Sequence, residues 1–324
     1  MRALVYDFPS QLKKSIEISK TYKLDLATKI NNVLICGLGG SGMGGELVKE
    51  CIRSLITVPL EVCHSYNLPN YVNKNTLVIV CSYSGETEET LSAFKESKDK
   101  NAQVVGITTG GKLKDSLKTN STVIIPGGLP PRAALAYPLV QLLEILGQAK
   151  LIDGELKKRV ESYIPTLIEE QPNIVKVAQQ ALDFSASNKI FFYSEDKFKP
   201  LLVRACQQIN ENSKDFAFYN VIPEMNHNEI LAWDNNPNLY SVIMFRSKLE
   251  YPRNTIRLNV TKEIIEQNTP VFEISAKGDT FIEQLLYLIH LVDFISLFKA
   301  ERLQIDADEI KAIDYLKNVL RASH

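Results

Sequence analysis

The chain has 324 residues, of which 45% are hydrophobic and 23% are charged. These proportions are typical of a folded globular protein and argue against disorder. The 37 Lys and Arg residues nearly balance the 38 Asp and Glu residues, so no net positive charge is present to attract nucleic acid or an acidic membrane surface. No apolar run is long enough to cross a membrane, and the N-terminal segment does not resemble a secretion signal. We therefore expect a cytoplasmic protein that binds neither nucleic acid nor membrane.

The five cysteines and four histidines are scattered along the chain. Their spacings include no Cys-x-x-Cys pair and no pair of histidines that would place two ligands on one face of a helix. The sequence therefore predicts no structural metal and no disulfide scaffold.

The first half of the chain alternates β-branched segments with helical patterns. The predicted strands lie at residues 31–37, 59–66, 76–82, 103–109 and 121–127. Nearly continuous apolar strands that alternate with helices are typical of a parallel sheet covered by helices on both faces. A long helix is predicted over residues 132–152, with a kink at Pro138.

The same alternation of strand and helix patterns recurs in the second half, after a long helical segment. The predicted strands there lie at residues 189–194, 216–220, 240–245 and 270–275. This repetition predicts an α/β protein of two domains of similar build, residues 1–152 and 153–324. The later segment FIEQLLYLIHLVDFISLF is apolar nearly all round, which is typical of a helix buried in a core or in an interface between subunits.

A glycine-rich turn follows the first predicted strand, in the segment GLGGSGMGG. Gly37, Gly39 and Gly42 satisfy the Gly-x-Gly-x-x-Gly pattern of dinucleotide-binding folds, and Glu61 follows at about the distance expected for the acidic residue of that pattern. Glu61 falls inside the second predicted strand, however, rather than at its carboxyl end, where a ribose would lie. An NAD-dependent oxidoreductase is therefore one alternative.

A second polar turn, CSYSGETEET, follows the third predicted strand and contains Ser82, Ser84 and Thr87. Parallel strands place the loops after their carboxyl ends at one edge of the sheet, so two helix N-termini converge there. Hydroxyl and backbone N–H groups at such a place suit the oxygens of a phosphate monoester. The alternative is that Ser82 or Ser84 only caps a helix whose glutamates complement the helix dipole. If a phosphate does bind, those glutamates should face away from it.

These two turns resemble the phosphate-binding loops of the sugar isomerase (SIS) domain. The segments GGLPPRAALAY at 127–137 and ENSKDFAFYNVIPEMNHNEILAW at 211–233 resemble the bifunctional phosphoglucose/phosphomannose isomerase family. That resemblance covers nearly the whole chain. It implies two SIS subdomains with flavodoxin-like parallel sheets and a homodimer that builds the active site. It also implies interconversion of glucose 6-phosphate or mannose 6-phosphate with fructose 6-phosphate without a cofactor.

The resemblance also implies roles for individual residues. Arg132 matches the active-site arginine, Glu211 the catalytic base and His227 the residue that opens the sugar ring. A C-terminal lysine is matched by Lys317, with Lys311 as the alternative. The phosphate-loop positions match Gly40, Ser41, Ser82, Ser84 and Thr87.

The chemistry of the implied reaction needs residues of these types. Moving a proton between C1 and C2 of an open-chain sugar requires a base close to both carbons, which Glu211 can supply. Histidine exchanges protons with hydroxyl groups near pH 7, and His227 lies in a polar segment. Arg132 can stabilise the enediolate. A second alternative is a sugar-phosphate sensor, which would keep the loops but would have no use for Glu211 or His227.

Overall fold

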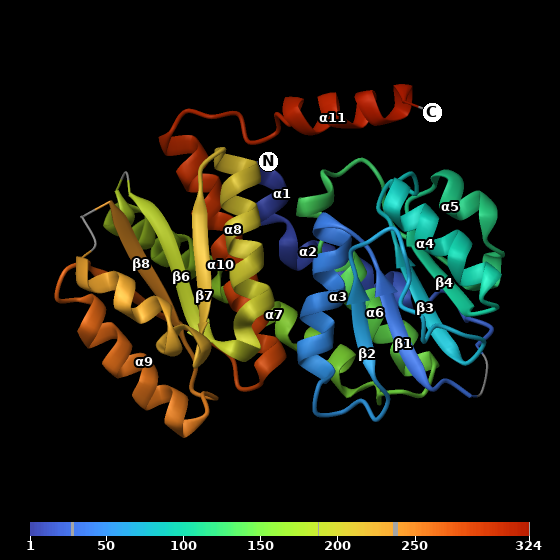
Figure 1. The fold of residues 1–324 in the computed structure, drawn as a ribbon, viewed down its shortest axis with the longest axis horizontal. Coiled ribbons are helices and arrows are strands. Elements are labelled where there is room, and N and C mark those ends of the chain that lie inside the picture. Colours follow the sequence, from blue (N-terminus) through green and yellow to red (C-terminus); the bar gives the residue numbers. More distant parts are fainter. Residues whose placement is uncertain (27–28, 187, 236–238, 324) are drawn as a thin grey trace. The chain divides into compact units, whose positions relative to one another are not determined.

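The structure is a computed structural model that describes residues 1–26, 29–186, 188–235 and 239–323. These residues pack as two compact units (Figure 1). The first unit comprises Tyr6–Glu170 and Gly278–Leu286, and the second unit comprises the rest of the described chain. The division of the chain into domains at residues 152 and 153 stays a prediction, because a compact unit is not by itself an independently folding domain.

The first unit is built on a five-stranded sheet of order β2-β1-β3-β4-β5, and every neighbouring pair is parallel. Its strands are β1 (Asn32–Cys36), β2 (Leu60–Cys63), β3 (Thr76–Cys81), β4 (Gln103–Thr108) and β5 (Thr122–Ile124). The central strand β3 is buried along its whole length, as expected when helices cover both faces of a parallel sheet. From β1 the chain passes to β2 on one side and then to β3 on the other side of β1, so the strand order reverses between β1 and β3. Ligands bind at such a switch point in open α/β sheets.

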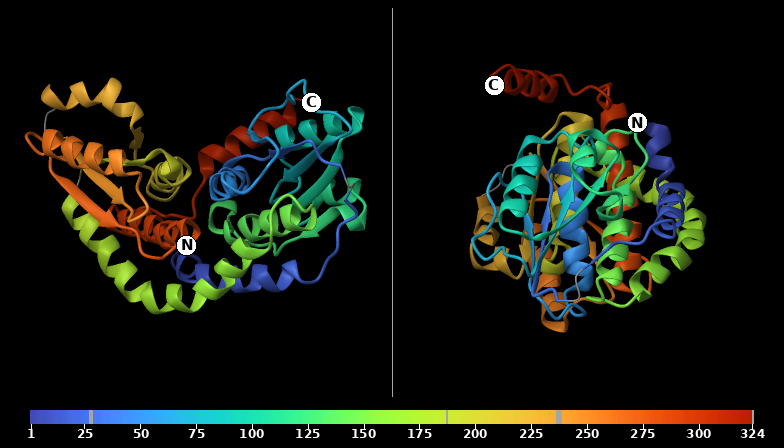
Figure 2. Two further views of the ribbon diagram at one scale, coloured as in Figure 1. Left: turned by 90° about the horizontal axis from the view of Figure 1, so that it is seen from below. Right: turned by 90° about the vertical axis from the view of Figure 1, so that its right-hand side faces the viewer.

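Helices cover both faces of this sheet (Figure 2). The helices are α2 (Phe8–Ser19), α3 (Gly39–Ile52), α4 (Glu88–Asp99), α5 (Gly111–Ser116) and α6 (Ala136–Gln148), with short 3₁₀ segments η1 (Thr119–Ser121) and η2 (Pro131–Ala133). Phe94 of α4 and Leu113 of α5 pack with Val78 and Val80 on one face. On the other face Gly45 of α3 lies directly against the side chain of Ile35.

The long helix predicted over residues 132–152 is shorter than expected. Its first residues form η2, and the helix α6 begins only at Ala136. Pro138 therefore lies in the first turn, where the backbone N–H groups of a helix have no acceptor within the helix. The proline marks the start of the helix and does not kink it.

The second unit is built on a four-stranded parallel sheet of order β7-β6-β8-β9. Its strands are β6 (Lys189–Glu195), β7 (Ala217–Ile222), β8 (Tyr240–Arg246) and β9 (Val271–Ser275). Leu258 and Ile265 of α9 (Pro252–Ile265) pack with Tyr193, Val242 and Trp233 on one face. The expected fold class, two parallel sheets flanked by helices, is confirmed.

The remaining helices range from the short N-terminal α1 to the long α7 and α10. They are α1 (Arg2–Tyr6), α7 (Glu155–Ser185), α8 (Lys199–Ser213), α10 (Phe281–Arg302) and α11 (Lys311–Ala322), with short segments η3 (Asp196–Phe198), η4 (Glu224–His227) and η5 (Glu229–Asn235). The helix α10 is long and apolar enough to cross a membrane, although Glu283 and Asp293 interrupt its apolar run. Of its most apolar 18 residues, 89% are buried within the protein. It is therefore the buried helix that its all-round apolar sequence predicts.

Candidate active site

The switch point of the first sheet carries both loops that the sequence singles out. The strand β1 ends at Cys36 and α3 begins at Gly39, whereas β3 ends at Cys81 and α4 begins at Glu88. The N-termini of α3 and α4 therefore open on the same edge of the sheet. Leu38 and Thr87 are the N-cap residues of the two helices. Within the described residues, neither side chain forms a capping hydrogen bond. The first N–H groups of both helices are thus left for a ligand or for water.

Hydroxyl groups fill this switch point, and most of them are already used as acceptors. The Ser41 Oγ accepts a hydrogen bond from the Tyr83 N–H at 3.2 Å, and the Ser84 Oγ accepts one from the Glu86 N–H at 3.2 Å. The Thr87 Oγ1 accepts one from the Ser82 hydroxyl at 3.0 Å. Among the described residues, the hydroxyl protons of Ser41, Ser84 and Thr87 have no acceptor, so they are available to donate to an anion.

Ser82 has a different place in the same loop. Its side chain is 1% exposed, and its hydroxyl donates to Thr87 while accepting from the Gly85 N–H at 3.1 Å. Ser82 therefore orients Thr87 and does not point its own proton outward. The loop glutamate Glu86 faces α5, where its carboxylate accepts a hydrogen bond from the Lys112 N–H at 2.8 Å.

Arg132 lies beside the glycine-rich turn. A side-chain carbon added at Gly40 would come within 2.6 Å of the Pro131 carbonyl oxygen and 3.3 Å of the Arg132 backbone nitrogen. Only glycine allows η2 to approach this closely. Arg132 itself is 4% exposed. The loops after β1 and β3 and the segment η2 therefore form one cluster within the first unit.

Tyr83 connects the parts of this cluster. Its backbone N–H donates to Ser41, and its hydroxyl donates to the Pro126 carbonyl at 2.9 Å and accepts from the Leu129 N–H at 2.9 Å. It thereby ties the loop after β3 to the glycine turn and to the segment that leads into η2. No sequence pattern indicates this role, because the three contacts join residues far apart in the chain.

Glu211 lies in the second unit, in the last turn of α8, and its side chain is half-buried. Polar contacts with α10 fix the orientation of this helix. Arg204 binds the carboxylate of Asp293 through two nitrogens, at 3.1 and 2.6 Å, and Gln208 donates to the same group at 2.7 Å. One turn further on, Asn212 donates to the Ser296 hydroxyl at 2.9 Å. These buried contacts hold the face of α8 next to Glu211.

His227 lies at the other end of β7 from Glu211. The helix α8 ends just before β7 begins, whereas η4, which ends at His227, follows the last residue of that strand. The side chain of His227 is exposed. Six residues of parallel strand span about 20 Å. One chain therefore does not bring Glu211 and His227 together.

Both candidate lysines lie on α11. Lys311 pairs with Glu309 at 2.8 Å, and both Lys311 and Lys317 are exposed. The Lys214 ammonium, near the end of α8, donates to the carbonyls of Glu211 and Asp306, each at 2.9 Å, and so fastens the segment before α11 to the helix that carries Glu211. The choice between Lys317 and Lys311 stays open.

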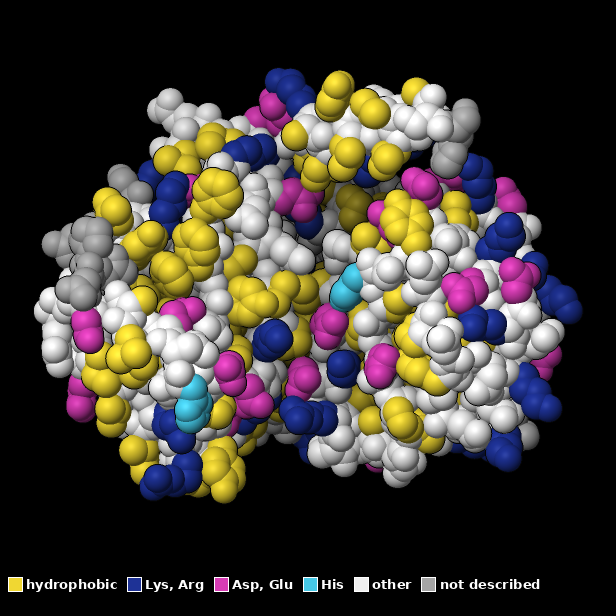
Figure 3. All heavy atoms as spheres, in the orientation of Figure 1, with side chains coloured by type: hydrophobic (Ala, Val, Ile, Leu, Met, Phe, Trp, Pro, Cys, Tyr) yellow, Lys and Arg dark blue, Asp and Glu magenta, His cyan; other side chains and the backbone are white. Residues whose placement is uncertain are grey.

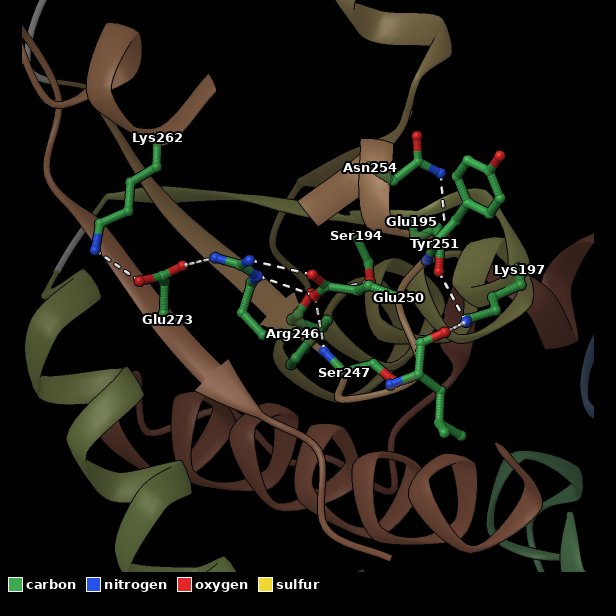
Figure 4. A network of polar contacts seen from close by, with 12 residues as sticks. Ser194, Glu195, Lys197, Arg246, Ser247, Glu250, Tyr251, Asn254, Lys262 and Glu273 are labelled. Atoms are coloured by element: carbon green, nitrogen blue, oxygen red, sulfur yellow. Dashed lines mark hydrogen bonds and ion pairs between the residues drawn. The ribbon is translucent and has the colours of Figure 1, made fainter. Parts of the chain in front are cut away.

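The second sheet has its own switch point, between β6 and β8, but its own side chains fill it (Figure 4). Glu195 ends β6 and is 3% exposed. Its carboxylate accepts hydrogen bonds from the Tyr251 N–H at 2.8 Å and the Asn254 amide at 2.9 Å, and it pairs with Lys197 at 2.8 Å. Because Tyr251 is the N-cap residue of α9, this carboxylate lies where an anion would meet that helix.

The position of Glu61 argues against the dinucleotide alternative. It is the second residue of β2, and its carboxylate accepts a hydrogen bond from the Tyr71 hydroxyl at 2.8 Å. It therefore does not reach the carboxyl edge where a ribose would bind. Across the described residues, no three His, Cys, Asp or Glu side chains lie together as a metal site would require.

Comparison with known proteins identifies the family. Residues 27–129 match the model of the SIS domain, and residues 175–320 match that of the bacterial phospho-glucose isomerase C-terminal SIS domain. A relative from Caldicellulosiruptor bescii, named bifunctional phosphoglucose/phosphomannose isomerase, is 37% identical over 98% of this chain and 97% of its own length. This chain belongs to the bifunctional phosphoglucose/phosphomannose isomerase family.

Another member of the family, from Aquifex aeolicus, is 31% identical over 91% of this chain and 92% of its own length. Among solved structures, a hypothetical protein from Thermus thermophilus has a TM-score of 0.77 at 15% identity and covers 98% of this chain and 89% of its own. That likeness concerns the fold alone. Membership in the bifunctional phosphoglucose/phosphomannose isomerase family confirms the resemblance read from the four sequence motifs.

Proposed function

We propose that the chain is a cytoplasmic aldose-ketose isomerase that interconverts glucose 6-phosphate or mannose 6-phosphate with fructose 6-phosphate. One observation carries the proposal. The switch point of the first sheet brings together two helix N-termini without side-chain caps. It also holds three hydroxyl groups with available protons, in a chain that belongs to this family. This arrangement suits the phosphate of a sugar 6-phosphate.

The phosphate is held by the loops of the first unit. The Gly40 N–H and the hydroxyls of Ser41, Ser84 and Thr87 donate to its oxygens, while Ser82 orients Thr87. Binding the phosphate, which does not react, positions the sugar carbons for the chemical step.

The chemical step is a proton transfer by Glu211. Its carboxylate removes the C2 proton of the open-chain aldose, and the C2–H electron pair becomes the C1–C2 double bond of a cis-enediolate whose charge lies on O1. The same carboxylic acid returns the proton to C1, a proton moves from O2 to O1, and the ketose forms. Arg132 stabilises the negative oxygen, and His227 opens the ring by protonating the ring oxygen. Lys317, or alternatively Lys311, adds a positive charge.

A homodimer accounts for the separation of Glu211 and His227. Residues at opposite ends of one strand that spans about 20 Å do not act on the same two carbons. We therefore propose that His227 acts in the site of a second copy of the chain. Apolar side chains exposed along α11, including Ile313, Leu316 and Leu320, offer a surface for such a partner (Figure 3).

Turnover of both sugars tests the activity. We expect the wild-type protein to convert glucose 6-phosphate and mannose 6-phosphate to fructose 6-phosphate, equally well with and without a chelator. Glu211→Gln should bind the sugar phosphate nearly as tightly and lose turnover, by at least about 10²-fold, because the amide cannot accept the C2 proton. Full activity in that variant would contradict the mechanism.

Mixed dimers test the sharing of the site. Glu211→Gln and His227→Asn proteins, each nearly inactive alone, are unfolded together and refolded. A heterodimer contains one site with both native residues, so we expect about a quarter of wild-type activity at equal mixing. Refolding each variant with itself is the control. If mixing restores no activity, the two residues act within one chain.

A further inference from the structure

His64 directly follows β2 and lies against the glycine-rich turn. Its Nδ1 is 2.7 Å from the Gly37 carbonyl oxygen, and its Nε2 is 3.1 Å from the Glu46 Oε1 on α3. The imidazole side chain is 47% exposed, and that of Glu46 is 31% exposed. The ring therefore connects the start of the glycine-rich turn to the helix that this turn opens.

Both neighbours of the imidazole ring are acceptors. A backbone carbonyl and a carboxylate have no proton to donate, so each contact requires an N–H on the ring. A neutral imidazole has only one N–H, and the imidazolium has two. The geometry therefore fits the charged form of His64. The hydrogen bond to Glu46 raises the pKa of His64 above its ordinary value of 6.5, the Gly37 carbonyl raises it further, and burial opposes them. Among the described residues, the Cys63 side chain also raises the pKa of His64, and a hydrogen bond with Cys36 lowers the pKa of the Cys63 thiol itself to about 6.

The ring also packs on the first turn of α3. A side-chain carbon at Gly42 would come within 2.8 Å of the His64 Cε1 and 2.4 Å of the Gly37 carbonyl oxygen. Without the imidazolium, the Gly37 carbonyl and the Glu46 carboxylate would leave negative charge beside the glycine-rich turn, where it would repel a phosphate. The imidazolium offsets both charges and holds the carbonyl in place.

We propose that doubly protonated His64 is a positioning residue of the phosphate-binding turn, and that its deprotonation weakens the binding of sugar 6-phosphates. The proposal rests on the phosphate role of the turn given above. His64 acts through the Gly37 carbonyl and does not touch the substrate. It therefore affects KM and leaves kcat nearly unchanged.

Steady-state kinetics against pH test this role. KM and kcat for glucose 6-phosphate are measured from about pH 7 to 9, where the substrate phosphate is already a dianion, since its second pKa is about 6. We expect the wild-type KM to rise several-fold over this range. His64→Gln should show the high KM at every pH, and His64→Arg, which stays charged, should show a low KM at every pH.

Two further variants test whether the pH dependence of KM arises from the contact between His64 and Glu46. Glu46→Gln lowers the pKa of His64 and should move the rise in KM to lower pH. Glu50→Gln removes a charge from the same helix, where Glu50 pairs with Arg53 at 3.6 Å, and should leave the wild-type profile unchanged. A wild-type KM that stays flat, or one equally high in His64→Arg and His64→Gln, would overturn the proposal. Absence of turnover in the wild type would instead contradict the proposed function. Calorimetry with glucose 6-phosphate over the same pH range would then test His64: weaker binding at high pH in the wild type but not in His64→Arg supports its role, and binding that does not change with pH contradicts it.

Discussion

At Gly40 and Gly42 the backbone of the glycine-rich turn lies very close to other residues. A side chain at Gly40 would meet the Pro131 carbonyl, and one at Gly42 would meet both Gly37 and His64. The two glycines are therefore needed for close approach, and neither has a positive φ angle. Positive φ occurs at Gly39 and Gly85 of the same two loops, at 53° and 70°. There glycine is needed for the conformation of the backbone itself.

Gly40→Ala tests the close approach. The added methyl group should push η2 away from the turn and displace Arg132, lowering kcat/KM for glucose 6-phosphate by about tenfold or more. Gly147→Ala is the matched control, because among the described residues no atom outside its own stretch of helix lies within 4 Å of the added carbon. It should keep full activity. Equal activity in both variants would mean that the contact between the turn and η2 is unimportant.

At the scale of elements, α8 and α10 are joined by buried polar contacts. Arg204 and Asp293 are 2% and 5% exposed, and burial raises the pKa of Asp293 although Arg204 opposes the change. A buried ion pair is worth little compared with apolar packing, but the loss of one partner leaves a buried charge uncompensated. This connection therefore serves chiefly to fix how α8, and with it Glu211, is oriented.

Removal of the Asp293 charge should consequently be costly. Asp293→Asn removes the carboxylate that the buried Arg204 guanidinium binds through two nitrogens, and we expect the free energy of unfolding to fall by about 3–5 kcal/mol in urea titrations. Asp183→Asn, which breaks an exposed pair with Arg302, should change the stability little. A small effect at Asp293 would show that water reaches the pair.

Glu195 makes the stability of the second sheet depend on pH. Burial alone would raise the pKa of its carboxyl, but the hydrogen bonds from Lys197, Asn254 and the Tyr251 N–H outweigh burial and lower it below 4.5. A carboxyl whose pKa is lowered on folding stabilises the protein above its unfolded pKa, and this stabilisation is lost as the pH falls through the folded pKa.

Glu195→Gln should therefore destabilise the protein at neutral pH by about 1–3 kcal/mol. The difference from the wild type should shrink as the pH falls below 4.5, because the wild-type carboxyl then also becomes neutral. Urea unfolding at several pH values measures this difference. Glu169→Gln, on an exposed position of α7, is the control. A difference that stays constant with pH would contradict the role given to the charge.

At the scale of the whole molecule, the two sheets are built alike but differ in the side chains at their switch points. Both are parallel and both have a switch point, yet hydroxyl groups surround the first while a carboxylate and its partners fill the second. We expect calorimetry with glucose 6-phosphate and the Glu211→Gln variant to give one bound sugar phosphate per chain. Two per chain would mean that the network around Glu195 opens.

Much of this fold could be predicted from the sequence. Strands buried on both faces appear as runs of β-branched residues, and the two loops at the first switch point appear as clusters of glycine and serine. The position of Glu61 inside a strand followed from the same patterns. The roles of Tyr83, His64 and Glu195 could not be predicted. Each depends on contacts between distant parts of the chain, and a tyrosine, a histidine or a glutamate next to a strand has no periodic signature.

The separation of Glu211 from His227 along β7 has a consequence for assays. If each site takes its histidine from a second chain, the isolated chain is inactive however well it is folded. Specific activity would then fall on dilution as chains separate, and recover with added protein or with substrate, which binds the completed site. Rates measured at very low enzyme concentration would therefore report the association of chains as much as the chemistry.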